Sequence, residues 1–381
     1  MILYTAQALF LGAVLLCATL SGRRLDAFLT AFVCLWTFGV VAIYWKYGTA
    51  QNYWYSDDQV VQARLVDYVN QNPLVYSLRG IVQLRYVVTI PAAVLTRIGI
   101  DSLLALKFLQ AVFFVLIYRL VREHFRIENL KFKVWYIVLF CGPLIAFMSL
   151  LGLRDLALAY FALATMIGRD GRIYAIGWIG LFLLRPHLAV ALVFGLLLGY
   201  AISRIRINFH LLYLPLIVLV SFVSGTYAYI VGLHFQDNLP LEFGTVSQLW
   251  TQSAFIRLLA NFGGMQFLLF DSAIVNLSII RLFLLRLIFV DTFVVPILFV
   301  WTMISTSKFQ RQSISILAAF AFFIGLISTT DYNSSRQNLP FLVLMGVSVI
   351  MDMASRERRE SFEAPAIATS KVDAVAIPRG I

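Results

Sequence analysis

The sequence predicts an all-helical protein embedded in a membrane. Hydrophobic residues make up 61% of its 381 residues and charged residues only 13%, and the mean hydropathy is +0.86. Apolar stretches alternate with short basic turns along most of the chain. A soluble fold cannot bury that much apolar surface, whereas helices in lipid satisfy their backbone hydrogen bonds within each segment.

Eleven apolar windows are each a candidate membrane span. They lie near residues 2–20, 27–44, 102–121, 133–149, 151–168, 172–185, 187–204, 211–232, 286–304, 312–328 and 337–353. The run from Tyr86 to Ile100 carries Pro91 and Arg97 and is short for a span. We therefore expect a membrane domain over residues 1–355 with about eleven transmembrane helices.

Two longer segments between the predicted spans, residues 45–101 and 233–285, are expected outside the cell. The first contains a short apolar helix at Tyr86 to Ile100, expected to lie on the outer surface or to be re-entrant, and the second contains one near Ile274 to Leu285 that suits the membrane interface. The last residues, 356–381, lose apolar periodicity and are predicted to form a disordered cytoplasmic tail.

Basic residues predict the orientation, because short cytoplasmic loops of membrane proteins are rich in Lys and Arg. With eleven spans, the basic clusters all fall on one side; they are Arg23 and Arg24, Arg119 to Lys133, Arg169 and Arg172, Arg204 and Arg206, Lys308 and Arg311, and Arg356 to Arg359. The N-terminus is then outside and the C-terminus inside. The net charge of +11 comes mostly from these loops and not from a long basic patch, which argues against nucleic-acid binding.

Nothing in the sequence indicates a metal or another cofactor. Cys17, Cys34 and Cys141 lie in apolar runs, where isolated cysteines act as small hydrophobic side chains. Apart from the pair Asp57-Asp58, no cluster of carboxylates has the spacing of metal ligands. The first apolar run lacks a basic region and a cleavage site, so we expect it to be retained as a helix.

Several ionisable residues lie at helix ends on the predicted outer side, where a charge is costly and indicates a function. Arginine is prominent among them: Arg85, Arg154, Arg185 and Arg336, with Asp155 beside Arg154. A guanidinium presents a fixed fork of donors to phosphate oxygens, so several together would hold a lipid diphosphate. The alternative for each is a local ion pair or an anchor at the membrane interface.

The tripeptide Arg185-Pro186-His187 combines a helix stop with a proline suited to the first turn of the next helix. A neutral His187 at that position is a candidate general base for a sugar hydroxyl. The alternative is a histidine that only caps the helix or is satisfied in the core.

The pair Asp57-Asp58 lies in the first external segment, before the amphipathic run VVQARLVDYV. Adjacent carboxylates can serve as a base or hold a metal. They can equally cap the helix that follows, with Ser56 or Asp57 as the N-cap.

The run LRDLALAYFALA, the later RPHLAVAL and the final SSRQNLPF resemble the central and late helices of EpsG-like and Wzy-type polysaccharide polymerases. The resemblance implies a bacterial inner-membrane enzyme of glycan synthesis. It would take a glycan from undecaprenyl diphosphate at the outer leaflet and join it to the next lipid-linked repeat unit, alongside other assembly proteins. Arg154, Arg185 and Arg336 would hold the diphosphates and His187 would activate the acceptor. The family's usual Gln or Glu beside the first arginine is Asp155 here.

Two other functions fit the same sequence. A GT-C type glycosyltransferase uses a polyprenyl-phosphate sugar and an acidic pair in its first external loop, which Asp57-Asp58 resembles, although this pair follows the second predicted span. A carrier of lipid-linked sugars would need a polar path across the bilayer. Apart from Lys107, the predicted spans are nearly free of charge.

Overall fold

The structure, a computed structural model, describes residues 2–19, 26–48, 56–72, 80, 84–125, 144–168, 170–205, 215, 219, 290–305, 310–327 and 338–353. Within these ranges the regular secondary structure is helical and no strand occurs. The prediction of a helical protein is therefore confirmed. Residues 133–143 of the window 133–149, the window 211–232 apart from residues 215 and 219, the whole segment 233–285 and the tail 356–381 lie outside the described residues.

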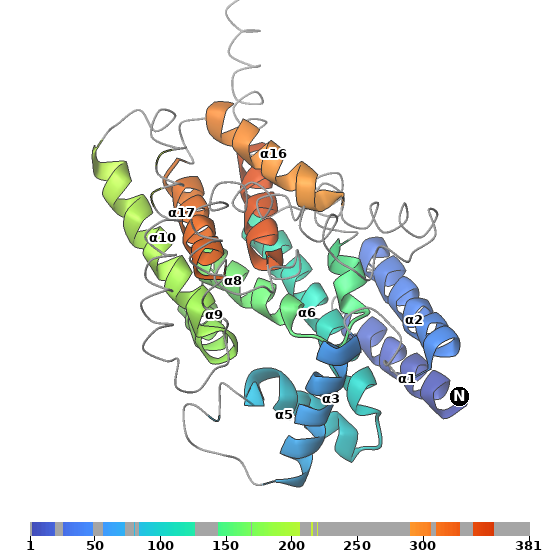
Figure 1. The fold of residues 1–381 in the computed structure, drawn as a ribbon. Coiled ribbons are helices and arrows are strands. Elements are labelled where there is room, and N and C mark those ends of the chain that lie inside the picture. The colour runs from blue at the N-terminus through green and yellow to red at the C-terminus, as the bar shows by residue number, and fades with distance from the viewer. Residues whose placement is uncertain are drawn as a thin grey trace, which may run out of the picture.

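The helices follow one another as shown in Figure 1. They are α1 (Ile2–Thr19), α2 (Ala27–Tyr47), α3 (Ser56–Gln71), α5 (Tyr86–Arg97), α6 (Ser102–Phe125), α8 (Asp155–Ile167), α9 (Gly171–Leu184), α10 (Pro186–Ile205), α16 (Asp291–Ser305), α17 (Gln310–Ile327) and a C-terminal helix, Leu339–Met353. Among the described residues, α1, α2 and the Ser102–Glu123 part of α6 are long and apolar enough to cross a membrane. The count of eleven spans remains a prediction.

The helices α1 and α6 run in the same direction, and side-chain hydrogen bonds join both of their ends. Gln7 Nε2 donates to Gly99 O at 2.6 Å, and Arg119 Nη2 donates to Ala18 O at 2.5 Å. At the same end of α6, Arg122 bonds Asp26, which begins α2 by accepting backbone N–H groups of its first turn. We call the two ends of the bundle the Gly99 end and the Asp26 end.

Two shorter helices, α3 and α5, pack on each other and on α6 at the Gly99 end, where α1 also begins (Figure 1). Arg97 Nε, in the last turn of α5, donates to Asn70 Oδ1 of α3 at 2.9 Å. The expected short helix at residues 86–100 is thus present, three residues shorter, as α5. Its place at a membrane interface remains a prediction.

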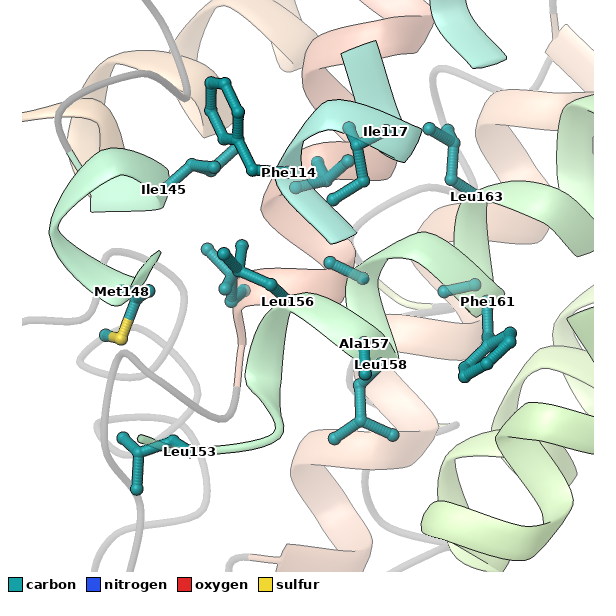
Figure 2. Packing of buried hydrophobic residues seen from close by; sticks show 14 of the residues in the cluster. Phe114, Ile117, Ile145, Met148, Leu153, Leu156, Ala157, Leu158, Phe161 and Leu163 are labelled. Atoms are coloured by element: carbon teal, nitrogen blue, oxygen red, sulfur yellow. The ribbon is translucent and has the colours of Figure 1, made fainter. Parts of the chain in front are cut away.

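The helix α8 lies at the centre of the bundle and is buried on almost every side. Figure 2 shows Leu156 of α8 close to Phe114 and Ile117 of α6 and to Ile145 and Met148 of the preceding segment. Its sequence is apolar around its whole circumference, as expected of a helix with neighbours on all faces. The start of α8 therefore packs against other parts of the protein and is not exposed to solvent.

Close helix contacts fix the remaining directions. Gly180 of α9 packs directly on the ring of Phe161 of α8, so that α8 and α9 form a tight antiparallel hairpin. Gly195 of α10 approaches the backbone of α17 at Ser315, and α17 runs antiparallel to α10. Consequently the start of α8, the α9–α10 junction and the end of α17 all lie on the side of the bundle nearer the Gly99 end.

Candidate functional site

The helix that carries Arg154 and Asp155 begins later than the sequence suggests. An apolar window from residue 151 predicts a helix with Arg154 about one turn inside it. In the structure residues 150–154 are not helical, α8 starts at Asp155, and Arg154 is its N-cap with φ −120° and ψ 3°. The prediction of the helix start was wrong. Arg154 and Asp155 therefore mark a helix N-terminus inside the protein.

Three side chains from other helices hold this non-helical segment. Trp36 Nε1 of α2 donates to Ser149 O at 3.0 Å. Gln59 Oε1 of α3 accepts the backbone N–H of Gly152 at 3.0 Å. A third, Gln110 Oε1 of α6, accepts the N–H of Leu156 at 3.0 Å. These bonds satisfy backbone groups that a continuous helix would have paired internally, and so stabilise the break.

The break lies well inside the bundle. Gly152 packs on Leu103, near the start of α6, where an added Cβ would come within 2.4 Å of Leu103 Cδ1. Gln110, which bonds the start of α8, is eight residues along α6 from Ser102. At about 1.5 Å per helical residue, the start of α8 lies level with a point about 12 Å along the axis of α6 from its first residue.

Arg154 joins the start of α8 to the end of α9. Its Nη1 donates to the backbone oxygen of Leu184 at 3.1 Å, and its side chain is half-buried. A cation at the C-terminus of α9 is favourable, because the last carbonyls of a helix have no partner within it. Asp155 is only 3% exposed at the first turn of α8. A carboxylate is favourable there because it faces the positive end of the helix dipole.

Arg185 is the non-helical residue between α9 and α10, and His187 is the second residue of α10; the sequence correctly predicts the helix stop here and Pro186 in the first turn of the next helix. Arg185 Nε donates to His187 Nε2 at 2.8 Å. Both groups lie against the ring of Phe323 of α17: the guanidinium carbon is 5.3 Å from its centroid, and the imidazole stacks on it at 6.0 Å. Arg185 is 8% exposed, whereas His187 is exposed.

The structure thus brings Arg154, Arg185 and His187 together, and we call them the Arg–His cluster. Arg154 bonds the carbonyl of Leu184, the residue before Arg185, and Arg185 bonds His187, so the three side chains lie at one helix junction. Two fixed cations with forked donors, beside an exposed imidazole, form a site suited to an anion with several oxygens. Binding of a lipid diphosphate at these residues stays a prediction.

The acidic pair lies close to the same break in the chain. Asp57 and Asp58 are in the first turn of α3, and the next residue, Gln59, bonds Gly152. The helix includes Ser56 and Asp57, so neither residue is the N-cap that the sequence suggests. The bond from Gly152 to the Gln59 side chain therefore brings the start of α3 near the segment that leads to Arg154.

Arg85 stands immediately before α5 with φ 55° and ψ 45°. Among the described residues it is the one residue other than glycine with a positive φ. This left-handed conformation costs a non-glycine residue about 1 kcal/mol or more, and such residues often occur at functional sites. Its helix packs on α9, the helix that ends at Leu184.

Arg336 lies outside the described residues. The helices on either side of it meet near the cluster, since Phe341 of the C-terminal helix is 5.3 Å from Phe323, ring centre to ring centre. Within the described part of the chain, no group of three or more His, Cys, Asp or Glu side chains could hold a metal ion.

Sequence reasoning missed the side chains that shape the site. Gln59 and Gln110 are both 0% exposed, and Trp36 is 1% exposed. Lys107 is 3% exposed and lies on the same face of α6 as Leu103 and Gln110. The signal for Gln110 and Lys107 is their polarity within an otherwise apolar stretch, at a spacing of one helical turn.

Comparison with known proteins gives no relative. The chain matches no protein-family model, no curated protein and no solved structure.

Proposed function

We propose that this protein is a membrane glycosyltransferase of the polymerase type, which acts on glycans linked to a lipid diphosphate. The observation that carries the proposal is that Arg154, bonded to Leu184 O, and Arg185, bonded to His187 Nε2, lie together where α9 ends and α10 begins. Several guanidinium groups bind the two phosphates of a diphosphate and stabilise the negative charge that develops as it leaves.

In the proposed reaction, the bond between the anomeric carbon of the donor glycan and the diphosphate oxygen breaks, and its electron pair leaves with the diphosphate. A hydroxyl oxygen of the acceptor glycan forms the new bond to that carbon, and its proton passes to a base. His187 is the candidate base, with Asp57 or Asp58 as the alternative. Arg85 and Arg336 are candidates for further contacts to the phosphates.

The proposed substrate is a glycan on undecaprenyl diphosphate, and the acceptor is the next lipid-linked repeat unit. The proposed location is the bacterial plasma membrane, with the Gly99 end of the bundle facing outward and the C-terminus in the cytoplasm. Support for this orientation comes from Arg119 and Arg122, which lie at the Asp26 end.

One observation favours a second candidate, a GT-C type transferase with Asp57 and Asp58 as its acidic pair. Gln59 follows this pair directly, and its bond to Gly152 joins the start of α3 to the segment that leads to Arg154. A carboxylate base near a phosphate-binding arginine is what such an enzyme needs.

The two candidates differ in the lipid product. A polymerase releases undecaprenyl diphosphate, whereas a GT-C transferase releases the monophosphate, so chromatography of the spent lipid separates them. We expect diphosphate from purified protein supplied with lipid-linked repeat units. Release of the monophosphate from a polyprenyl-phosphate sugar would overturn the polymerase in favour of the GT-C transferase.

Arginine variants test the site itself. Arg154→Lys and Arg185→Lys keep the charge but lose the forked donors, so chain growth should fall about 10- to 100-fold, leaving single repeat units on a glycan gel. Arg172→Lys is the matched control, because this exposed arginine begins α9 at the opposite end of the hairpin. Full-length chains from both site variants would remove these arginines from the reaction.

A further inference from the structure

The hydrogen bond between Arg185 and His187 determines which nitrogen of the imidazole carries the proton. An arginine side chain has donors only, so His187 Nε2 must offer its lone pair to Arg185 Nε across the 2.8 Å that separates them. The ring is then neutral, with its proton on Nδ1. The nitrogen that could accept a proton from a substrate is therefore occupied by Arg185.

The backbone around this pair is fixed. The backbone N–H of Arg185 donates to Leu181 O at 2.7 Å, and its carbonyl accepts from the N–H of Leu188 at 3.0 Å. Phe323 lies against both side chains. Freeing Nε2 consequently requires only a movement of the Arg185 side chain, because the helix ends on either side can stay in place.

A diphosphate can cause that movement. The bond to His187 has an uncharged acceptor, whereas phosphate oxygens are negatively charged and match the fork of a guanidinium, which can bond two of them at once. Arg154 also presents its guanidinium to an uncharged acceptor, the Leu184 carbonyl, at 3.1 Å. An arriving diphosphate therefore competes with His187 for the Arg185 guanidinium and with the Leu184 carbonyl for that of Arg154.

We propose that Arg185 is a gate on His187: the diphosphate of the donor draws the Arg185 guanidinium away and so releases Nε2 to accept the proton of the acceptor hydroxyl. This proposal rests on the proposed function. Arg185 is then a positioning residue for the base as well as a ligand of the phosphate. The base becomes available only when a donor is bound, which restricts its action to productive complexes.

Chemical modification of His187 tests the gate without any enzyme assay. Diethyl pyrocarbonate reacts with the unprotonated nitrogen of a neutral imidazole, and mass spectrometry measures the rate at each of the four histidines. In the full-length protein in detergent, we expect inorganic diphosphate to speed modification of His187 by about two- to tenfold, the effect of releasing one hydrogen bond. The other histidines serve as internal references.

Arg185→Met removes the donors, so His187 should react quickly with or without diphosphate. If this variant elutes as an aggregate, Arg185→Lys is the second variant, with an intermediate rate expected because lysine lacks the planar fork. Slow, diphosphate-independent modification of His187 in a folded variant would overturn the gate.

Equilibrium dialysis with labelled diphosphate separates the two proposals. If diphosphate binds wild-type protein but leaves the His187 rate unchanged or slower, the gate is wrong and the phosphate site stands. If diphosphate does not bind at all, both the phosphate site of the proposed function and the gate are wrong. Binding together with faster modification supports both.

Discussion

Gln110 Oε1 accepts the backbone N–H of Leu156 at 3.0 Å, and this bond between α6 and α8 replaces the N-cap that the chain does not supply locally. Arg154, the residue at the N-cap, makes no side-chain cap of its own. First-turn N–H groups of a buried helix need a partner, because water cannot reach them. The position of Gln110 on α6 thus determines where α8 begins and where Arg154 and Asp155 lie.

The variant Gln110→Leu should destabilise the protein, because it leaves the buried N–H of Leu156 without an acceptor. The expected cost is about 1–3 kcal/mol. Among the described residues Gln110 Nε2 has no hydrogen-bond partner, so within that part of the chain the substitution removes a single bond. Thermal unfolding in detergent should show a lower midpoint, and the glycan gel should show shorter chains because Arg154 is no longer held.

The matched control is Gln71→Leu, at the exposed end of α3. Its free energy of unfolding should stay within about 0.5 kcal/mol of wild type, as for most surface substitutions, so its thermal midpoint should barely change. Equal midpoints for Gln110→Leu and wild type would show that the start of α8 does not depend on α6.

Much of the fold could be predicted from the sequence. Long apolar runs identify α1, α2 and α6, and the break at Arg185-Pro186 follows from the restricted backbone of proline. The apolar run that continues through residues 150–154 conceals the break before α8. A hydropathy pattern cannot reveal this break, because the hydrogen bonds that stabilise it come from Gln59 and Gln110, which are distant in the sequence.

The residues of the candidate site could be predicted from the sequence, but their contacts could not. Arg154, Arg185 and His187 stand out as polar residues at the ends of apolar helices, and the structure brings them together. Sequence reasoning treats His187 as a free base, because the bond from Arg185 Nε depends on side-chain placement. Whether Asp57 and Asp58 take part remains a prediction.

The contact between α10 and α17 predicts a large effect of Gly195→Ala. An added Cβ would come within 2.3 Å of the Ser315 backbone oxygen and 2.6 Å of Ala319 Cβ. Backbone cannot yield as a flexible side chain does, so the helices must separate, at a cost of about 1–3 kcal/mol. The thermal midpoint should fall, and because His187 and Phe323 lie on these two helices, chain growth should fall too.

Gly171→Ala, at the start of α9, is the matched control for this substitution. Beyond its chain neighbours and the backbone of its own helix, no atom of the described residues lies within 4 Å of its added Cβ. It should equal or slightly exceed wild-type stability, because alanine favours helix. A midpoint for Gly195→Ala equal to that of Gly171→Ala would contradict the close approach of α10 and α17.

At the Asp26 end, one carboxylate joins α2 to α6. Asp26 accepts the N–H of Phe28 at 3.0 Å, the hydroxyl of Tyr118 at 2.6 Å and Nη1 of Arg122 at 2.8 Å. Asp26→Ala loses all of these and should cost about 1–2 kcal/mol, as for other lost N-caps. Asp26→Asn keeps the cap and should cost less.

Arg122→Ala completes that series. The arginine side chain is 52% exposed, so its ion pair should contribute at most about 1 kcal/mol. The expected order of unfolding midpoints is therefore Arg122→Ala highest, then Asp26→Asn, then Asp26→Ala. If Arg122→Ala is the most damaging of the three, the ion pair outweighs the helix cap and the order is wrong.

The predicted orientation can be tested at two exposed arginines on opposite ends of the bundle. Arg97 ends α5 at the Gly99 end, and Arg172 follows the N-cap of α9 at the far end of the α8–α9 hairpin. In a protein whose native cysteines are replaced by serine, Arg97→Cys should react with an impermeant thiol reagent in intact cells. Arg172→Cys should react only after permeabilisation. The reverse pattern would place the Arg–His cluster on the cytoplasmic side, where an outer-leaflet glycan could not reach it.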